Sequence, residues 1–505
     1  MREGNVNYTL KLLTHHLEEI GRLGGVMGVL HWDQEVVMPK GATEARASQM
    51  SAIAGIIHEK CIDPKIGYWL DILEQDNSLE LFDKANIREV RRDYERQIKI
   101  PKELVQEMAI LKARAHPVWV KARNDDRYQD FSPQLQRWIE LKSQWAQHID
   151  PEKSPYDVNI DHYERNEKME HLDRVFDHLK VELIPLIKTI IESGNDPNDS
   201  FLIGNFSLTK QESLGQKISK AMGFDFDRGR LDVSVHPFCG GAHPTDVRIT
   251  TRYREDDFVE SLYAVIHETG HGLYEQGRME KGRDLPVSEA LSMGIHESQS
   301  LFWERMIAQG SAFCDHYMAL FAEIFPDQLN GVSSWEFYKA INIVRPSMIR
   351  VESDELTYPM HVILRYELEK GLFDGSYSTI DLPEIWNAKM EEYLGIRPES
   401  DKDGVLQDIH WSMGAFGYFP SYTLGAIYAC QFYNALKRDM PDVIEKIQED
   451  SLAKVKSWLN GKIHSQGKLY SINDLMQKVT GEALNPDHFI RYLKEKYSTI
   501  YNLSL

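Results

Sequence analysis

Hydrophobic residues recur at helical intervals along almost the whole of this 505-residue chain. From about residue 7 to 190, amphipathic stretches alternate with short breaks, which is typical of helices that each bury one face. Charged runs such as REVRRDYERQIKIPKEL fit the solvated faces of such helices. One segment differs, because residues 231–253 predict two short strands around the turn CGGAHPTD. We therefore expect a mainly α fold with one small β-sheet.

A metal-binding motif follows this β segment. Residues 267–271 are His-Glu-Thr-Gly-His, within a stretch whose apolar residues have helical spacing. On a helix, His267 and His271 share one face and can bind the same ion, and Glu268 can reach a water molecule held there. Gly270 and Gly272 lower helix propensity, which suggests close packing against a metal site or a substrate. The motif therefore predicts a zinc hydrolase.

A catalytic zinc ion usually has three protein ligands and one open position. We expect the third ligand on the next predicted helix, within residues 286–310, and Glu297 is the first choice. The other candidates on this segment are Glu289, which ranks second, and then Glu304 and His296. Gly294 would let this helix approach the first one closely. A set of two His and one Glu is typical of zinc peptidases.

Further motifs are spread over nearly the whole chain. They are HESQS at 296–300, WDQE at 32–35, HPF at 236–238, DVRIT at 246–250, IRVESD at 349–354 and GVLQDIHW at 404–411. Together with HETGH, they resemble the motifs of the carboxypeptidase Taq family of HExxH zinc metallocarboxypeptidases. One departure is Ser353, where the family commonly has Ala. The resemblance implies a neurolysin-like helical fold with a deep substrate groove, a homodimer, and release of single residues from the C-terminus of peptides.

Such an activity needs a group that recognises the free carboxylate of the peptide. The guanidinium of Arg suits this, because its planar fork can donate two hydrogen bonds and stays charged. The motif match favours Arg350, with Arg345 and Arg248 as alternatives. Asp354 can orient Arg350 if that stretch is helical. The β segment, which carries His236 and Arg248, can bind the peptide as an added strand; the alternative is an ordinary small sheet with a polar outer face.

The oxyanion formed during hydrolysis needs a hydrogen-bond donor. The candidates are Tyr418, Tyr422, His236 and His410. We rank Tyr422 and His410 first and place Tyr418 among the substrate contacts, although an aromatic run of this kind is more often part of a core. Pro420 and the nearby glycines predict that both tyrosines lie in a loop. The residues that either contact substrate or support those that do are Gln407, Asp408 and Trp411.

Composition limits the setting in which the protein works. The net charge of −20 disfavours a nucleic-acid partner, and no stretch approaches the roughly 18 consecutive apolar residues of a membrane span. The four cysteines are far apart and lack CxxC spacing, as expected for free thiols in a reducing compartment. The N-terminal segment lacks the apolar centre of a signal peptide. We expect a cytoplasmic protein.

No linker, repeat or low-complexity tract divides the chain. We therefore predict a single catalytic unit over residues 1–505, with two lobes around a groove. Within it, residues 1–190 form an N-terminal helical part, and residues 230–425 carry the zinc and substrate sites.

These predictions combine into one reaction. One Zn2+ per chain, with Co2+ as the alternative metal, would be bound by His267, His271 and Glu297. Glu268 acts as general base, and Arg350 holds the terminal carboxylate of the peptide. Two other functions stay open. The first is an endo-acting zinc oligopeptidase without a carboxylate clamp, and the more remote one is a non-catalytic helical protein with a structural zinc.

Overall fold

The computed structural model describes residues 2–504 and is mainly helical with one small sheet, which confirms the predicted fold class. The helices before the sheet are α1 (Arg2–Val36), α2 (Thr43–Cys61), α3 (Pro64–Leu73), α4 (Leu81–Lys99), α5 (Lys102–Asn124), α6 (Tyr128–Ile149), α7 (Pro155–Tyr163), α8 (Met169–Ser193) and α9 (Leu208–Met222). The strands are β1 (Gly229–Val233), β2 (Cys239–His243) and β3 (Asp246–Thr251).

The remaining elements follow the sheet. The helices are α10 (Phe258–Gln276), α11 (Met293–Leu301), α12 (Ser311–Ile324), α13 (Pro326–Leu329), α14 (Ser334–Ala340), α15 (Tyr358–Asp374), α16 (Leu382–Leu394), α17 (Pro420–Asp439), α18 (Val443–Gln448), α19 (Leu452–Lys462), α20 (Ile472–Thr480) and α21 (Asp487–Tyr501). Short 3₁₀ turns include η5 (Arg350–Glu352) and η6 (His410–Met413), and a π-helical segment, η4 (Phe302–Ala308), directly continues α11.

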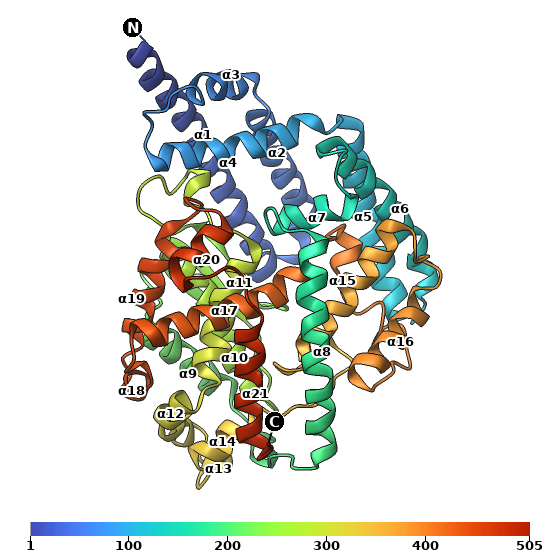
Figure 1. The fold of residues 1–505 in the computed structure, drawn as a ribbon, viewed down its shortest axis with the longest axis vertical. Coiled ribbons are helices and arrows are strands. Elements are labelled where there is room, and N and C mark those ends of the chain that lie inside the picture. The colour runs from blue at the N-terminus through green and yellow to red at the C-terminus, as the bar shows by residue number, and fades with distance from the viewer. Residues whose placement is uncertain (1, 505) are drawn as a thin grey trace.

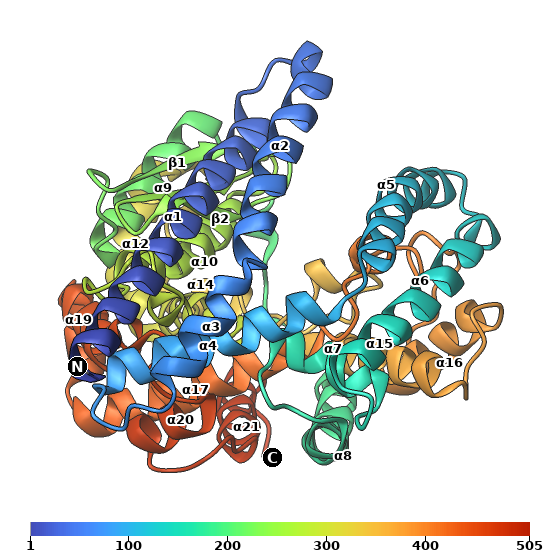
Figure 2. The ribbon, with the colours of Figure 1, turned by 90° about the horizontal axis from the view of Figure 1, so that it is seen from above.

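Two main hydrophobic cores organise these helices. The larger one extends from α5 to α21 and includes the inner face of the sheet, and the smaller one is formed by α1, α3 and α4 with Leu285 and Val287. Figure 1 shows α10, α11 and α17 close together. In Figure 2, α1 and α2 lie to one side and α5 and α6 to the other, with α4 running between them. No helix in residues 2–504 is long and apolar enough to cross a membrane.

The sheet has the order β1-β3-β2, with β1 parallel and β2 antiparallel to β3. The prediction of two strands around a CGGAHPTD turn is wrong, because CGGAH itself forms β2 and only Pro244 and Thr245 remain as the turn. Gly241 has a φ of 135°, and the register shifts between Gly241 and His243. Glycine tolerates this backbone, so the glycine-rich segment forms a bulged strand.

Two glycines of α1 allow this helix to contact the backbone of β2. A Cβ atom at Gly25 would lie 2.5 Å from the carbonyl oxygen of Ala242, and one at Gly28 would overlap the carbonyl oxygen of Gly241. Such atoms cannot approach so closely, so any side chain at either position would push the helix away from the sheet. The glycines lower helix propensity but permit this contact.

We expect Gly28→Ala to lower the thermal unfolding midpoint, since overpacking of this kind typically costs about 1–3 kcal/mol. The matched control is Gly24→Ala in the same helix, because no described atom would lie within 4 Å of its new Cβ. The control should keep or raise the midpoint, because Ala is favoured over Gly in helices by up to about 1 kcal/mol. Thermal unfolding followed by circular dichroism compares the two. Equal midpoints would contradict the proposed role of the contact.

Candidate active site

The three predicted metal ligands meet in the structure. His267 and His271 come from α10 and Glu297 from α11, and one ligand atom of each lies within 4.8 Å of the others. Glu297 Oε2 is 3.8 Å from His267 Nε2 and 3.5 Å from His271 Nε2. The three side chains are 14–22% exposed, so solvent can reach them. Glu289, the second choice for the third ligand, instead forms an ion pair of 2.7 Å with Lys468.

Each of the two histidines is held through its other ring nitrogen. His267 Nδ1 lies 2.7 Å from Glu304 Oε2, and His271 Nδ1 lies 2.6 Å from His296 Nδ1. His296 Nε2 is in turn 3.0 Å from Glu275 Oε1. His267 Nδ1–H can donate to Glu304. His271 Nδ1–H can donate to His296, whose Nε2–H donates to Glu275. In this arrangement the Nε2 atoms of His267 and His271 keep a lone pair for a metal. Glu304 and His296, which the sequence offered as alternative ligands, therefore support the ligands.

Glu304 reaches His267 from the π-helical segment Phe302–Ala308. Segments of this kind are rare and often occur at functional sites. Burial alone would raise the pKa of Glu304, but its hydrogen bond with His267 and the nearby charge of Arg305 keep this pKa below its ordinary value. The pair thus joins a carboxylate to a ligand imidazole, which is common around catalytic metals.

Glu268 lies next to the first ligand and is 7% exposed. Burial raises the pKa of its carboxyl group to about 7. Its Oε2 atom is buried and has no hydrogen-bond partner among residues 2–504. Glu268 therefore has a free oxygen and can exchange a proton near neutral pH.

Glycines bring α10 and α17 close to α11 from two sides. A Cβ atom at Gly270 of α10 would lie 2.7 Å from the carbonyl oxygen of Gln299. A Cβ atom at Gly425 of α17 would lie 2.7 Å from Cγ and 2.8 Å from Cβ of Glu297. The helix that carries the third ligand is thus fixed between two neighbours that have no side chain at the contact.

Gly294 does not make the predicted approach to α10. It lies instead against Glu164, which follows α7 and whose carboxylate accepts the backbone N–H of Gly294. Ser421 of α17 also donates to Glu164, at 2.8 Å. Burial raises the pKa of Glu164 to about 7. This buried carboxyl group joins α11 to α17, and no motif in the sequence marks it.

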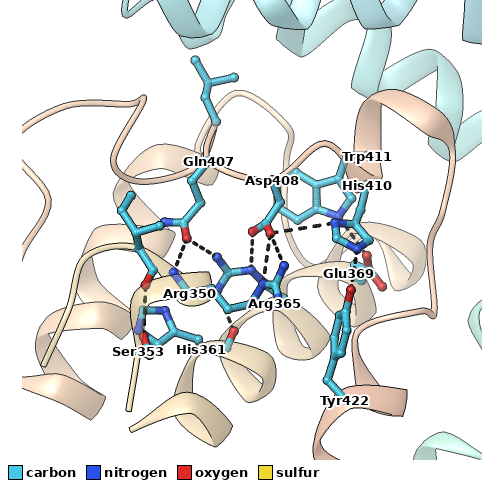
Figure 3. A network of polar contacts seen from close by, with 12 residues as sticks. Arg350, Ser353, His361, Arg365, Glu369, Gln407, Asp408, His410, Trp411 and Tyr422 are labelled. Carbon is cyan, nitrogen blue, oxygen red and sulfur yellow. Dashed lines mark hydrogen bonds and ion pairs between the residues drawn. The ribbon is translucent and has the colours of Figure 1, made fainter. Parts of the chain in front are cut away.

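A second polar cluster surrounds Arg350, which is 5% exposed (Figure 3). Its Nε and Nη2 atoms both donate to Asp408 Oδ1 at 3.0 Å, and its Nη1 donates to the Tyr358 hydroxyl at 2.6 Å. Arg365 donates to the other oxygen of Asp408 at 2.6 Å. Burial would raise the pKa of Asp408, but the charges of Arg365 and Arg350 hold it far below its usual value. Two cations thus share one carboxylate, and the three groups keep a net charge of +1.

The prediction that Asp354 orients Arg350 is wrong. The Asp354 carboxylate accepts the backbone N–H groups of Leu356 at 2.9 Å and Thr357 at 3.0 Å. It thereby caps the turn before α15. The chain at Arg350 forms only a short 3₁₀ turn, so the longer helix that would place Asp354 beside Arg350 is absent there. Asp408, from a different motif, orients Arg350 instead.

Gln407 also belongs to this cluster (Figure 3). Its Oε1 accepts from the backbone N–H of Arg350 at 2.8 Å and from Arg365 Nη2 at 2.6 Å. Its Nε2 donates to the carbonyl oxygens of Met348 and Asp403, both at 3.0 Å. Because these contacts already use both ends of its amide, the structure gives Gln407 a supporting position.

Tyr422 lies between Arg350 and His410. The guanidinium of Arg350 is 4.7 Å from the centre of the Tyr422 ring, and the Tyr422 hydroxyl is 3.2 Å from His410 Nε2. Tyr418 contacts Tyr422 edge to face, with ring centres 5.3 Å apart. Burial lowers the pKa of His410 to about 4, so this imidazole is neutral at pH 7. The predicted loop ends earlier than expected, because Pro420 starts α17 and places Tyr422 in its first turn.

The two clusters meet across one turn of α17. Tyr422 and Gly425 are three residues apart and therefore lie on one face of that helix. Tyr422 packs on Arg350, and Gly425 packs on Glu297. Burial raises the pKa of Tyr418, and the nearby charge of Glu297 raises it further. The guanidinium cluster is therefore a neighbour of the metal triad.

The β segment holds the other two predicted substrate contacts. Arg248 of β3 donates twice to Asp246 at 2.9 Å, and its guanidinium lies 4.3 Å from the ring centre of Trp32 in α1. The WDQE motif thus contributes a stacking partner for this arginine. His236 is exposed in the connection between β1 and β2. Arg345, an alternative to Arg350, is exposed and forms an ion pair with Asp199 at 2.6 Å.

No motif in the sequence predicts a role for Arg365 or Tyr358. Arg365 is fully buried and shares Asp408 with Arg350, while Tyr358 bonds directly to Arg350. The only sequence signal for Arg365 is a single arginine after the apolar run at 362–364 of α15. A charge in such a place needs a buried partner.

Comparison with known proteins identifies the class. Residues 12–497 match the carboxypeptidase Taq (M32) metallopeptidase family. The chain is 38% identical to carboxypeptidase 1 of Bacillus subtilis, over 98% of this chain and 97% of that protein. It is 37% identical to thermostable carboxypeptidase 1 of Thermus thermophilus, over 97% of each. The crystal structure of an M32 carboxypeptidase from Deinococcus radiodurans superposes with a TM-score of 0.96 at 34% identity, over 98% of this chain and 100% of that one.

The chain therefore belongs to the carboxypeptidase Taq (M32) family, as the motifs predicted. It is a metallocarboxypeptidase.

We expect Glu304→Gln to weaken metal binding by about 10–100-fold, because loss of a carboxylate that holds a ligand histidine has this effect in other metal sites. Competition with a chromophoric chelator measures the affinity. Glu289→Gln is the control, since the Glu289 carboxylate pairs with Lys468 outside the triad. The metal affinity of this variant should equal that of the wild type. An unchanged affinity in Glu304→Gln would contradict the supporting role.

Proposed function

We propose that this metallocarboxypeptidase holds a zinc ion with His267, His271 and Glu297 and removes one residue at a time from the C-terminus of peptides. The observation that carries the proposal is the position of Arg350. Its cluster packs on Tyr422, one turn along α17 from the contact of Gly425 with Glu297. A peptide carboxylate at Arg350 would thus lie near the metal ligands.

The donor set suits zinc. Two imidazole nitrogens and one carboxylate oxygen, with solvent access, are the ligands of many catalytic zinc sites, and Co2+ accepts similar donors. A bound zinc ion would polarise the scissile carbonyl and lower the pKa of water to about 7. Within residues 2–504, only His267, His271 and Glu297 gather as potential ligands. Structural zinc sites usually have a fourth ligand, so this set favours the catalytic role over the structural alternative.

Glu268 is the proposed general base. It neighbours a ligand histidine, and its buried Oε2 has no partner among the described residues. With a pKa near 7, the carboxylate can take a proton from the attacking water and then give it to the leaving amine.

Arg350 is the proposed clamp for the terminal carboxylate. A guanidinium has five N–H donors, and the hydrogen bonds to Asp408 and Tyr358 use three of those on Arg350. One N–H on each terminal nitrogen stays available, which is the fork that binds a carboxylate through two parallel bonds. The net charge of +1 shared with Arg365 and Asp408 favours an anion there. Exopeptidase action follows if this clamp fixes the distance to the scissile bond.

Tyr422 is the proposed oxyanion donor, and His410 is proposed to support it. A neutral His410 can donate from Nε2 to the Tyr422 hydroxyl, which leaves the hydroxyl proton free to point at substrate. Tyr418, His236 and Arg248 remain proposed substrate contacts. We reassign Asp354 and Gln407 to supporting roles, because backbone and arginine groups occupy their polar atoms.

We further propose that the chain acts as a single catalytic unit of two lobes, with residues 1–190 as its N-terminal helical part and 230–425 as the site region. The family resemblance favours a homodimer, and four free cysteines fit a cytoplasmic protein.

Glu268→Gln should keep the metal and lower kcat by about 10²–10⁴-fold, the usual contribution of a general base. Metal content by atomic absorption and turnover of a short peptide test this. Glu260→Gln, on the first turn of the same helix, serves as the control and should retain activity. Near-normal turnover of Glu268→Gln would exclude it as the base.

A ten-residue peptide and its C-terminally amidated twin test the clamp. We expect mass spectrometry to show a ladder losing one residue at a time from the free acid, with the amide resistant. Arg350→Lys should lower kcat/KM on the free acid by about tenfold or more, because it loses the paired hydrogen bonds while keeping the charge. The control is Arg345→Lys, an exposed arginine paired with Asp199. Internal cuts in both peptides would favour the endo-acting alternative.

A further inference from the structure

A positively charged hollow of about 360 Å³ lies where the second half of α4 passes the end of α6, α7 and the turn after α7. Seven of the side chains that line it are Arg or Lys and three are Asp or Glu, which gives the lining a net charge of +4. The whole chain has a net charge of −20, so this concentration runs against the rest of the protein. The cations that matter for the argument are Arg92, Arg96, Lys99, Lys153 and Arg165. We call this hollow the α4 basic pocket.

The arginines at the centre of the pocket share too few carboxylates. Arg92 Nη2 lies 2.7 Å from the carbonyl oxygen of Asp161 and 3.0 Å from Asp161 Oδ2. Arg96 donates to the same Oδ2 atom. The other oxygen, Oδ1, accepts the backbone N–H of Asn166 at 2.7 Å. One carboxylate therefore serves two guanidinium groups and a backbone amide.

A similar sharing occurs at Arg165. Its Nη1 donates to Glu89, and Arg88 also donates to Glu89, at 2.9 Å. Glu89 is only 4% exposed, so this carboxylate has little room for further partners. Four guanidinium groups, from α4 and from the turn after α7, thus share two carboxylates at the pocket.

Arg96 is also incompletely hydrogen-bonded. Nη1 of Arg96 is buried and has no hydrogen-bond partner within residues 2–504. Burial, and then the charge of Arg92, lowers the pKa of Arg96 to about 10. Burial and the charge of Arg165 likewise lower the pKa of Arg92. The positive charges therefore repel one another, and an anion in the pocket would relieve this repulsion.

We propose that the α4 basic pocket binds a small phosphate-bearing anion through Arg92, Arg96 and Arg165. Guanidinium groups suit phosphate because their fork can donate two parallel hydrogen bonds. The volume lies within the range of small-molecule sites, roughly 300–1,000 Å³, and exceeds the need of a single phosphate, so a diphosphate group fits best. Lys99 and Lys153 at the rim add charge for a second phosphate. The site shares no residue with the metal triad or the Arg350 cluster.

Isothermal titration calorimetry of the metal-loaded enzyme with inorganic pyrophosphate tests the proposal, in buffer free of phosphate and sulfate. Because pyrophosphate can remove zinc, metal content is measured before and after each titration. We expect saturable binding that weakens by about tenfold or more in Arg96→Gln, the loss expected for one hydrogen bond to a charged group. Arg137→Gln is the matched control, since Arg137 of α6 pairs with Glu107 and Glu140 outside the pocket. This variant should bind pyrophosphate as tightly as the wild type does.

Lys153→Gln gives a second variant that leaves the contacts of Asp161 intact, because Lys153 pairs with Asp150, at 3.2 Å, and not with Asp161. It should bind pyrophosphate more weakly while keeping full peptidase activity. Adenosine diphosphate distinguishes the source of the anion: tighter binding than pyrophosphate indicates a nucleotide, and equal or weaker binding indicates the inorganic group. The absence of saturable binding, or equal affinity in the wild type, Arg96→Gln and Lys153→Gln, would overturn the proposal.

Discussion

The position of Glu297 depends on the absence of a side chain opposite it. Gly425 lets α17 approach until its backbone meets the Glu297 side chain, and Gly270 lets α10 approach the backbone of α11 at Gln299 and Ser300. Because both contacts are already close, α11 has little freedom to shift or rotate. The same approach of α17 brings Tyr422, and with it Arg350, to the metal ligands. Helix packing thus sets the relation between the proposed metal ligands and the proposed substrate-binding groups.

Burial of charge is the second organising feature. Arg350 and Arg365 are almost fully buried and are tolerated because Asp408 bonds to both. Removal of one partner from such a group leaves a buried charge without compensation, which is usually costly. The arrangement also fixes the guanidinium of Arg350 in advance, so the proposed binding of a peptide carboxylate would require little reorganisation. The α4 basic pocket differs, because Nη1 of Arg96 is buried there without a hydrogen-bond partner among the described residues.

Local spacing in the sequence predicts that the three proposed metal ligands come together, as they do in the structure. His267 and His271 follow from helical periodicity, and Glu297 follows from the next amphipathic helix. Contacts between segments that are far apart in the sequence are harder to predict from it. Proximity in sequence favours Asp354 as the partner of Arg350, but in the structure that partner is Asp408, 58 residues away.

The prediction for the β segment is wrong for a different reason. Its glycines resemble turn residues in the sequence, yet they form β2, which pairs with β3 and packs against the backbone of α1. No local pattern encodes these partners. Tyr422 was placed in a loop on similar grounds, from the glycines and Pro420 around it. Proline can equally begin a helix, and glycine inside a helix can mark a close contact.

The π-helical segment Phe302–Ala308 also constrains how this chain can change over evolution. Each residue of an α-helix turns the chain by about 100°, so removal of one residue between Glu297 and Glu304 would rotate Glu304 away from His267. Insertion of one residue would rotate it in the opposite sense. Substitutions in this segment can preserve the contact, whereas a change in its length cannot. We therefore expect insertions and deletions to be selected against here even where individual side chains vary.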